Sequence, residues 1–270
     1  MHLATIQRRP SLDERIQRSQ QLRLQWSFAA EFLTTYELVL QFQQSLSIAL
    51  KKSTLHNYSH RRLPREVDLS PFLLEFQSLL LLTTESTPEA GAAPTKQVQN
   101  GNSEWEQLLR EYWSGTYNGN DATESFLLHA FLQPIAEHFA ANREIPALQH
   151  RLPVCPFCER RPVCGILRPE ADGARRSLLC SFCSTEWDYR RLVCPACEQE
   201  DVEKLPVYTA EEFPYIRIEA CDACHSFIKT IDLTKDGRAI PVVDEIASLP
   251  LTLWAQERDY RKLQPNLLLM

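Results

Sequence analysis

The chain has 270 residues, of which 44% are hydrophobic and 24% charged, and its formal net charge is −6. This length indicates one large domain or two of ordinary size. The acidic balance argues against a dedicated nucleic-acid-binding protein, because such domains are usually basic. No apolar run reaches the roughly 18 residues that a membrane-spanning helix requires, so we expect no membrane insertion.

The first ten residues, Met1 to Pro10, lack the apolar stretch of a secretory signal. We therefore expect a cytoplasmic protein. In that reducing compartment, paired cysteines bind metal ions more often than they form stable disulfides. None of the seven glycines lies in a phosphate-binding loop or a nucleophile elbow, which argues against nucleotide-driven chemistry and serine hydrolysis.

The first 150 residues contain no cysteine, and we predict that they form a helical domain. Ser11 and Glu14 match a capping box, and Ser70 before Pro71 predicts a second helix start with the serine as its cap. Two more helices are expected from Ser103 and from near Asp121, after a flexible loop over residues 84–103. Apolar residues at spacings of three and four follow the first start: Leu22, Trp26, Ala29, Leu33, Tyr36 and Leu40.

All nine cysteines lie between residues 155 and 224, and eight of them form four pairs with two residues between the partners. Such a spacer bends the backbone so that both thiols point at one ion, and two pairs complete a tetrahedral site. Gaps of 21, 10 and 23 residues separate successive pairs, which indicates a duplicated unit. We therefore predict two metal sites, the first from Cys155, Cys158, Cys180 and Cys183 and the second from Cys194, Cys197, Cys221 and Cys224.

Four thiolates suit zinc and rubredoxin-type iron alike, so the metal stays open at this stage. Disulfides or reduced core cysteines would not explain four identical spacings. The run from Cys221 to His225 also matches the C-x-x-C-H pattern of haem attachment, but no export signal accompanies it. His225 is an alternative ligand, although a solvated or hydrogen-bonded histidine is favoured. Cys164 is the odd cysteine, and we expect a packed or partly exposed thiol there.

A site of four thiolates has no open position for a substrate, whereas catalytic zinc normally keeps one for water. The sites therefore favour a structural or electron-transfer role, and we predict no catalytic residues. Three arginine pairs lie within residues 151–191, at 160–161, 175–176 and 190–191. They could form a docking face for an acidic partner, but solvation and salt bridges are the favoured interpretation.

The expected architecture is a multi-domain α plus small β protein. A first metal module over residues 151–191 and a second over residues 192–240 each contain a hairpin-like excursion between their cysteine pairs. These turn-rich modules bury little apolar surface, so metal binding would supply much of their folding free energy. A C-terminal helix from about Ile246, or from Pro250, and a tail would occupy residues 241–270.

With these motifs in place, the chain resembles the FdhE family of formate dehydrogenase accessory proteins. The resemblance lies in residues 179–187, 191–198, 219–229 and 243–249, and in the first cysteine pair followed by Pro162. It covers about residues 153–270 and includes residues other than the cysteines, namely Glu186, Trp187, Asp222, Lys229 and Asp244. Residues 1–150 are similar to the family only in helical character and position.

The resemblance implies a helical N-terminal domain followed by two rubredoxin-like or zinc-ribbon-like modules. It also implies a cytoplasmic chaperone that binds the catalytic subunit of a respiratory formate dehydrogenase and supports its maturation before export, with a homodimer left open. Glu159 and His225 stand where the family usually has glycine, a residue that often takes a positive φ in such knuckles. The alternatives are a rubredoxin-like electron-transfer or redox-sensing protein and a zinc-ribbon nucleic-acid binder.

Overall fold

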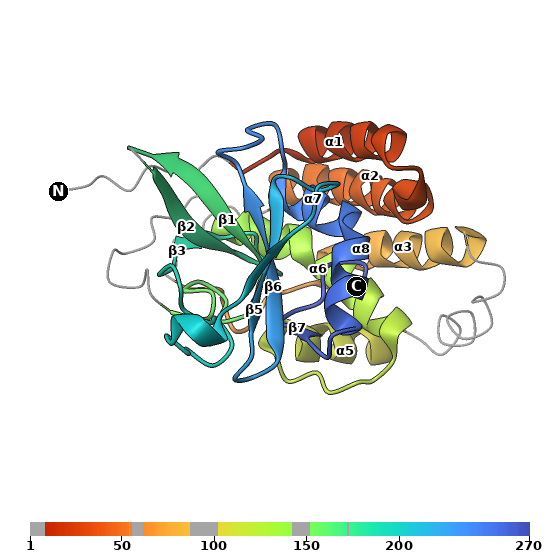
Figure 1. The fold of residues 1–270 in the computed structure, drawn as a ribbon. Helices are drawn as coiled ribbons and strands as arrows, with labels where there is room; N and C mark the ends of the chain where they lie inside the picture. The colour runs from red at the N-terminus through yellow and green to blue at the C-terminus, as the bar shows by residue number, and fades with distance from the viewer. Residues whose placement is uncertain (1–8, 54, 56–61, 87–101, 142–151, 172) are drawn as a thin grey trace. The chain divides into compact units, whose positions relative to one another are not determined.

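The computed structural model describes residues 9–53, 55, 62–86, 102–141, 152–171 and 173–270 (Figure 1). The chain divides into two compact units, a larger one from residues 1–40 and 142–270 and a smaller one from residues 41–141. Within the described residues, no helix is long and apolar enough to cross a membrane. The helices are α1 (Leu12–Gln25), α2 (Ala30–Lys52), α3 (Leu73–Ser86), α5 (Asn102–Ser114), α6 (Ala122–Ala140), α7 (Pro241–Ala247) and α8 (Leu249–Gln256).

One sheet organises the larger unit (Figure 1). Six strands follow the order β3-β2-β1-β6-β5-β4, and β7 pairs with β6 outside this path. The pairs β1–β6 and β6–β7 are parallel and the others antiparallel. The strands are β1 (Pro162–Glu170), β2 (Gly173–Cys180), β3 (Glu186–Asp188), β4 (Val207–Thr209), β5 (Ile216–Cys221), β6 (Ser226–Asp232) and β7 (Arg261–Lys262).

The pairing of β1 with β6 joins the two cysteine-bearing segments into this single sheet. Gly165 lies opposite Thr230 in the register of the two strands. A Cβ at residue 165 would lie 2.3 Å from the Thr230 hydroxyl oxygen, closer than Cβ atoms in proteins approach a neighbour. Glycine at this position therefore permits the strands to approach, which is the usual reason for a glycine inside a strand.

Helices α7, α8 and α1 complete the larger unit. Helix α7 packs against β1 and β6, and α1 packs against α7 (Figure 1). Ser11 and Glu14 form the predicted capping box at the start of α1, with Ser11 Oγ accepting the Glu14 N–H at 3.2 Å. The main apolar core lies between the sheet and α8 and includes Ile216, Ile218, Phe227, Ile231 and Ala255.

A buried ion pair fastens α1 to α7. The carboxylate of Asp244 is fully buried and accepts hydrogen bonds from Arg18 Nη2 at 2.5 Å, the Tyr215 hydroxyl at 2.8 Å and the Ile240 N–H at 2.7 Å. Burial, followed by the charge of Asp244, raises the pKa of Tyr215. Each partner is satisfied inside the core, as a buried charge requires.

The smaller unit is helical, as predicted for this part of the chain. Asp121 caps α6 by accepting the Glu124 N–H at 3.0 Å. Helix α6 packs against α3 and α5, and edge-to-face contacts join Phe76 to Trp105 and to Phe131. The helical region, the small sheet and the two four-cysteine groups confirm the predicted fold class.

One predicted helix start was wrong in detail. Ser70 does not cap its helix: its N–H donates to Asp68 Oδ1 at 3.0 Å, and a short 3₁₀ turn, η3 (Ser70–Phe72), precedes α3. The predicted start at Pro250 is confirmed, since α8 begins at Leu249 with Pro250 in its first turn, whereas the separate helix α7, which begins at Pro241 and ends before Ser248, was not predicted. Of the predicted 84–103 loop, residues 87–101 lie outside the described residues, while α3 runs to Ser86 and α5 begins at Asn102.

We predict that the substitution Asp244→Asn lowers the free energy of unfolding by about 3–5 kcal/mol, because it leaves Arg18 buried beside a neutral partner. Chemical denaturation followed by circular dichroism would measure the change. The matched control is Glu200→Gln in the same unit, where the pair with Arg190 is exposed to solvent and contributes little to stability. Equal losses of unfolding free energy in the two variants would contradict the conclusion that Asp244 anchors α7.

Candidate metal centres

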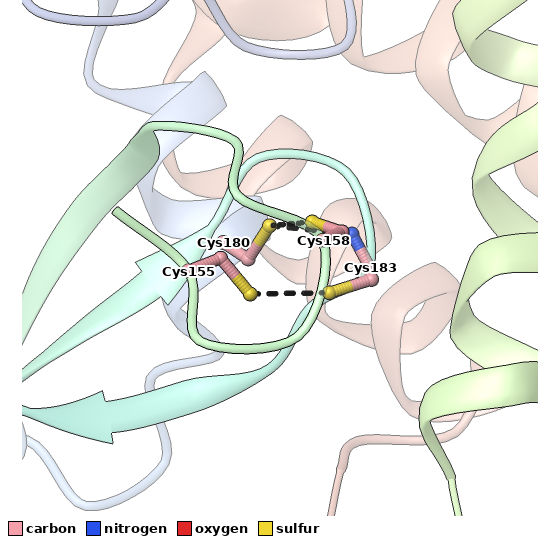
Figure 2. A group of neighbouring side chains, drawn as sticks. All are labelled: Cys155, Cys158, Cys180 and Cys183. Atoms are coloured by element: carbon pink, nitrogen blue, oxygen red, sulfur yellow. Dashed lines mark hydrogen bonds between the residues drawn. The ribbon is translucent and has the colours of Figure 1, made fainter. Parts of the chain in front are cut away.

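The first predicted group of cysteines converges on one point (Figure 2). Cys155 and Cys158 lie on the turn before β1, and Cys180 and Cys183 lie on the turn after β2. Figure 2 shows the two turns facing each other, with the four sulfurs directed inward. The Sγ atoms of Cys155 and Cys183 are 3.6 Å apart, and those of Cys158 and Cys180 are 3.3 Å apart.

The second group has the same arrangement in the other half of the sheet. Cys194 and Cys197 lie on the turn after β3, and Cys221 and Cys224 lie where β5 turns into β6. The Cys194 and Cys224 sulfurs are 3.7 Å apart, as are those of Cys197 and Cys221. In each group all four sulfurs lie within 4.8 Å of one another, so the structure brings together the eight cysteines in the predicted pairing.

The donor set fits a tetrahedral thiolate centre. Metal–sulfur bonds of about 2.3 Å at tetrahedral angles place neighbouring sulfurs about 3.8 Å apart, close to the spacing of 3.3–3.7 Å in these groups. A disulfide bond requires about 2.05 Å, and all nine cysteines are free thiols. The thiols are therefore spaced for a shared ion and not for bonding to each other.

The backbone at each pair forms the same tight turn. The residue after each second cysteine has a positive φ: Glu159 at 63°, Ser184 at 50°, Glu198 at 58° and His225 at 53°. At three of the turns its N–H donates to the carbonyl of the first cysteine, as Glu159 does to Cys155 at 2.9 Å. This conformation favours glycine and costs other residues energy, so Glu159 and His225 both bear that cost.

Backbone amides inside the turns point at sulfur. The N–H groups of Phe157 and Phe182 each donate to the sulfur two residues earlier, Cys155 and Cys180, at 3.4 Å. The N–H of Ala196 donates to Cys194 in the same way, also at 3.4 Å. Because hydrogen bonds to an ionised acceptor favour the ionised form, these turns are already arranged to hold thiolates.

The protonation of the thiols is uneven within each group. Burial, followed by hydrogen bonding with the neighbouring thiols, raises the pKa of Cys180. Burial also acts on Cys224, but hydrogen bonds with Ser226 and Cys197 outweigh it and lower the pKa of Cys224 to about 7. Four adjacent thiolates repel one another, so a cation is required before the whole group can ionise.

The two remaining sulfur and imidazole candidates lie outside these groups. Cys164 is fully buried on β1, and its burial raises its pKa well above the usual value, so it is a packed thiol. His225 is exposed, and its ring lies 6.2 Å from that of Tyr260, with four thiols already supplied by the second group. The arginine pairs are engaged in contacts, among them Arg176 with Glu219 and Arg190 with Glu200.

The sequence did not reveal a second buried charge cluster behind the sheet. Lys229 on β6 is 1% exposed and lies 3.0 Å from the fully buried Glu245 of α7, which also pairs with Lys262. Burial, against the opposing charge of Glu245, lowers the pKa of Lys229 to about 8. The available signal was a lysine next to Ile228 in a strand that also contains Phe227 and Ile231, where a buried charge is stable only when it is paired.

Comparisons with known proteins agree with this geometry. Residues 154–191 match the family model described as "FdhE, central domain", and residues 192–269 match "FdhE, C-terminal domain". A "Protein FdhE homolog" from Aquifex aeolicus is 32% identical, over 97% of this chain and 93% of its own length. The crystal structure of the FdhE protein from Pseudomonas aeruginosa superposes with a TM-score of 0.70 at 25% identity, covering 97% of each chain.

We predict that Glu159→Gly raises the free energy of unfolding by about 1 kcal/mol, because glycine relieves the cost of a positive φ. Denaturant titration of the metal-loaded protein at a fixed concentration of free metal would measure the gain. Glu203→Gly is the matched control, since Glu203 lies in the 3₁₀ helix η5 (Val202–Lys204) and is not among the residues with positive φ. A loss of stability in both variants would show that the turn at residue 159 is unstrained.

Proposed function

The chain belongs to the FdhE family, and from this premise we propose that it is an accessory protein that binds the catalytic subunit of a respiratory formate dehydrogenase. It supports the maturation of that subunit in the cytoplasm and does not itself catalyse a reaction. The observation that supports this proposal is the pair of four-thiol groups, which lie within the two segments matched by the family models.

We further propose that each group binds one metal ion through all four of its sulfurs. The ligands are Cys155, Cys158, Cys180 and Cys183 in the first module and Cys194, Cys197, Cys221 and Cys224 in the second. An ion with four thiolate ligands supplies structural cross-linking or one-electron exchange, and it leaves no position for an activated water. Because all four coordination positions are filled by cysteine, the sites support an accessory role rather than hydrolysis.

The surface that an ion would stabilise is the turn-rich side of the sheet. The turns that hold the second group are only partly buried, since Leu192, Cys197 and Ala223 are exposed while Val193 and Cys194 are buried. Small regions of this kind obtain much of their folding free energy from the metal. Loss of either ion would therefore alter the shape offered to the partner subunit.

A rubredoxin-like electron-transfer or redox-sensing function is the second candidate. The exposure of Cys197 supports it, because an ion at this group would lie near the surface where electrons can be exchanged. The identity of the bound metal distinguishes these two candidate functions. Iron would give a coloured protein that bleaches on reduction, whereas zinc has no redox chemistry and gives a colourless one.

We predict that protein purified without air from its native cells contains two metal ions per chain. Cys180→Ser and Cys221→Ser should each reduce the content to one, because each removes one ligand of a different group. Elemental analysis with a visible spectrum would measure the number and identity of the ions. Cys164→Ser is the matched control, since Cys164 lies outside both groups and should leave two ions in place.

We also predict that a tagged form of the chain retrieves the catalytic subunit of a formate dehydrogenase from its own cells. The retrieved protein would be identified by mass spectrometry, with Cys180→Ser expected to reduce its yield and Cys164→Ser to leave it unchanged. If the native chain retrieved no molybdenum- or tungsten-dependent oxidoreductase subunit, the accessory role would be wrong, whatever the metal content.

A further inference from the structure

The two four-cysteine groups have the same ligand spacing but differ in the solvent exposure of their cysteines. In the first group Cys155, Cys180 and Cys183 are at most 1% exposed, and Cys158 is half-buried. In the second group Cys197 is exposed and Cys224 is half-buried. Cys194 and Cys221 are 5% and 1% exposed, so the difference between the groups lies at Cys197, which is exposed where its counterpart Cys158 is half-buried.

The residue before the second cysteine of each pair also differs between the two modules. The first module has Phe157 and Phe182 there, and both are buried, at 4% and 0% exposed. The Arg160 guanidinium stacks 4.2 Å above the Phe182 ring and adds a second layer. The second module has Ala196 and Ala223 at the same positions, half-buried and exposed.

A pocket also reaches the second group. It has a volume of about 110 Å³ and is lined by Cys194 and Ser226, together with the exposed side chains of Leu192 and Val207. The second group is therefore approachable both at Cys197 and beside Cys194. The shell around a metal site controls solvent access and ligand exchange.

We propose that the second group is the reactive metal centre of this protein and exchanges its ion with soft ligands such as thiols, whereas the first group is an inert structural centre. In the exchange, Cys197 leaves as the thiol and takes the proton that the incoming thiol gives up. The ion keeps its oxidation state, so no oxidant is needed. This inference rests on the metal binding proposed above and goes beyond it by giving the two centres different roles.

The test uses the full chain loaded with two equivalents of zinc and the chromogenic chelator 4-(2-pyridylazo)resorcinol in excess. We expect two phases, with one equivalent released about tenfold or more faster than the other, in line with the effect of the surrounding shell on metal sites. N-ethylmaleimide added during the fast phase, followed by peptide mass spectrometry, should label Cys197 and Cys224 before the cysteines of the first group.

Two substitutions test the origin of the difference. Ala223→Phe places the missing ring over the second group at an exposed position that tolerates it, and it should slow the fast phase without changing the slow one. Phe157→Ala uncovers the first group and should accelerate the slow phase alone. Ala174→Phe, on β2 away from both groups, is the matched control and should change neither phase.

The possible failures are distinguishable. Two ions released at one rate, or early labelling of Cys155 or Cys183, would overturn the inference and leave the proposed metal binding intact. A chain that cannot hold an ion at the second group would overturn both.

Discussion

The parallel pairing of β1 with β6 is the constraint on which both metal centres depend. Strand β1 leaves the first cysteine pair and β2 ends at the second, while β5 ends at the fourth pair and β6 leaves it. The register that aligns Gly165 with Thr230 therefore positions both groups of thiols in one sheet. A larger residue at 165 would meet the Thr230 hydroxyl, so this junction between the two hairpins would have to shift.

Features set by short stretches of sequence were predictable. The capping box of Ser11 and Glu14, the cap at Asp121 and the convergence of eight cysteines each follow from residues a few positions apart or from a repeated spacing. The positive φ of Glu159 and His225 could also be anticipated, because the residue after the second cysteine of such a turn often takes this conformation. In all these cases the physical cause is local, and the tertiary fold only has to permit it.

Features that depend on distant partners could not be predicted in the same way. Arg18 meets Asp244 across 226 positions, and Lys229 meets Glu245 between a strand and a helix. The family resemblance included Asp244, Lys229 and Glu245 without their roles, and Arg18 lies outside it. Removing one partner of a buried pair leaves an uncompensated charge, so the pairs fix α1 and α7 against the sheet. The start of α7 had a local signal in Pro241, since proline favours the first turn of a helix.

The contrast between the two centres shows what ligand spacing alone omits. The C-x-x-C pattern determines which atoms meet and the tetrahedral geometry that they offer, and this is the same in both modules. It does not determine how easily another ligand reaches them, because access depends on the side chains between the cysteines. The residue before the second cysteine is phenylalanine in both pairs of the first module and alanine in both pairs of the second. A duplicated unit can thus keep one copy closed as a scaffold while the other opens to its surroundings, with no change in any ligand.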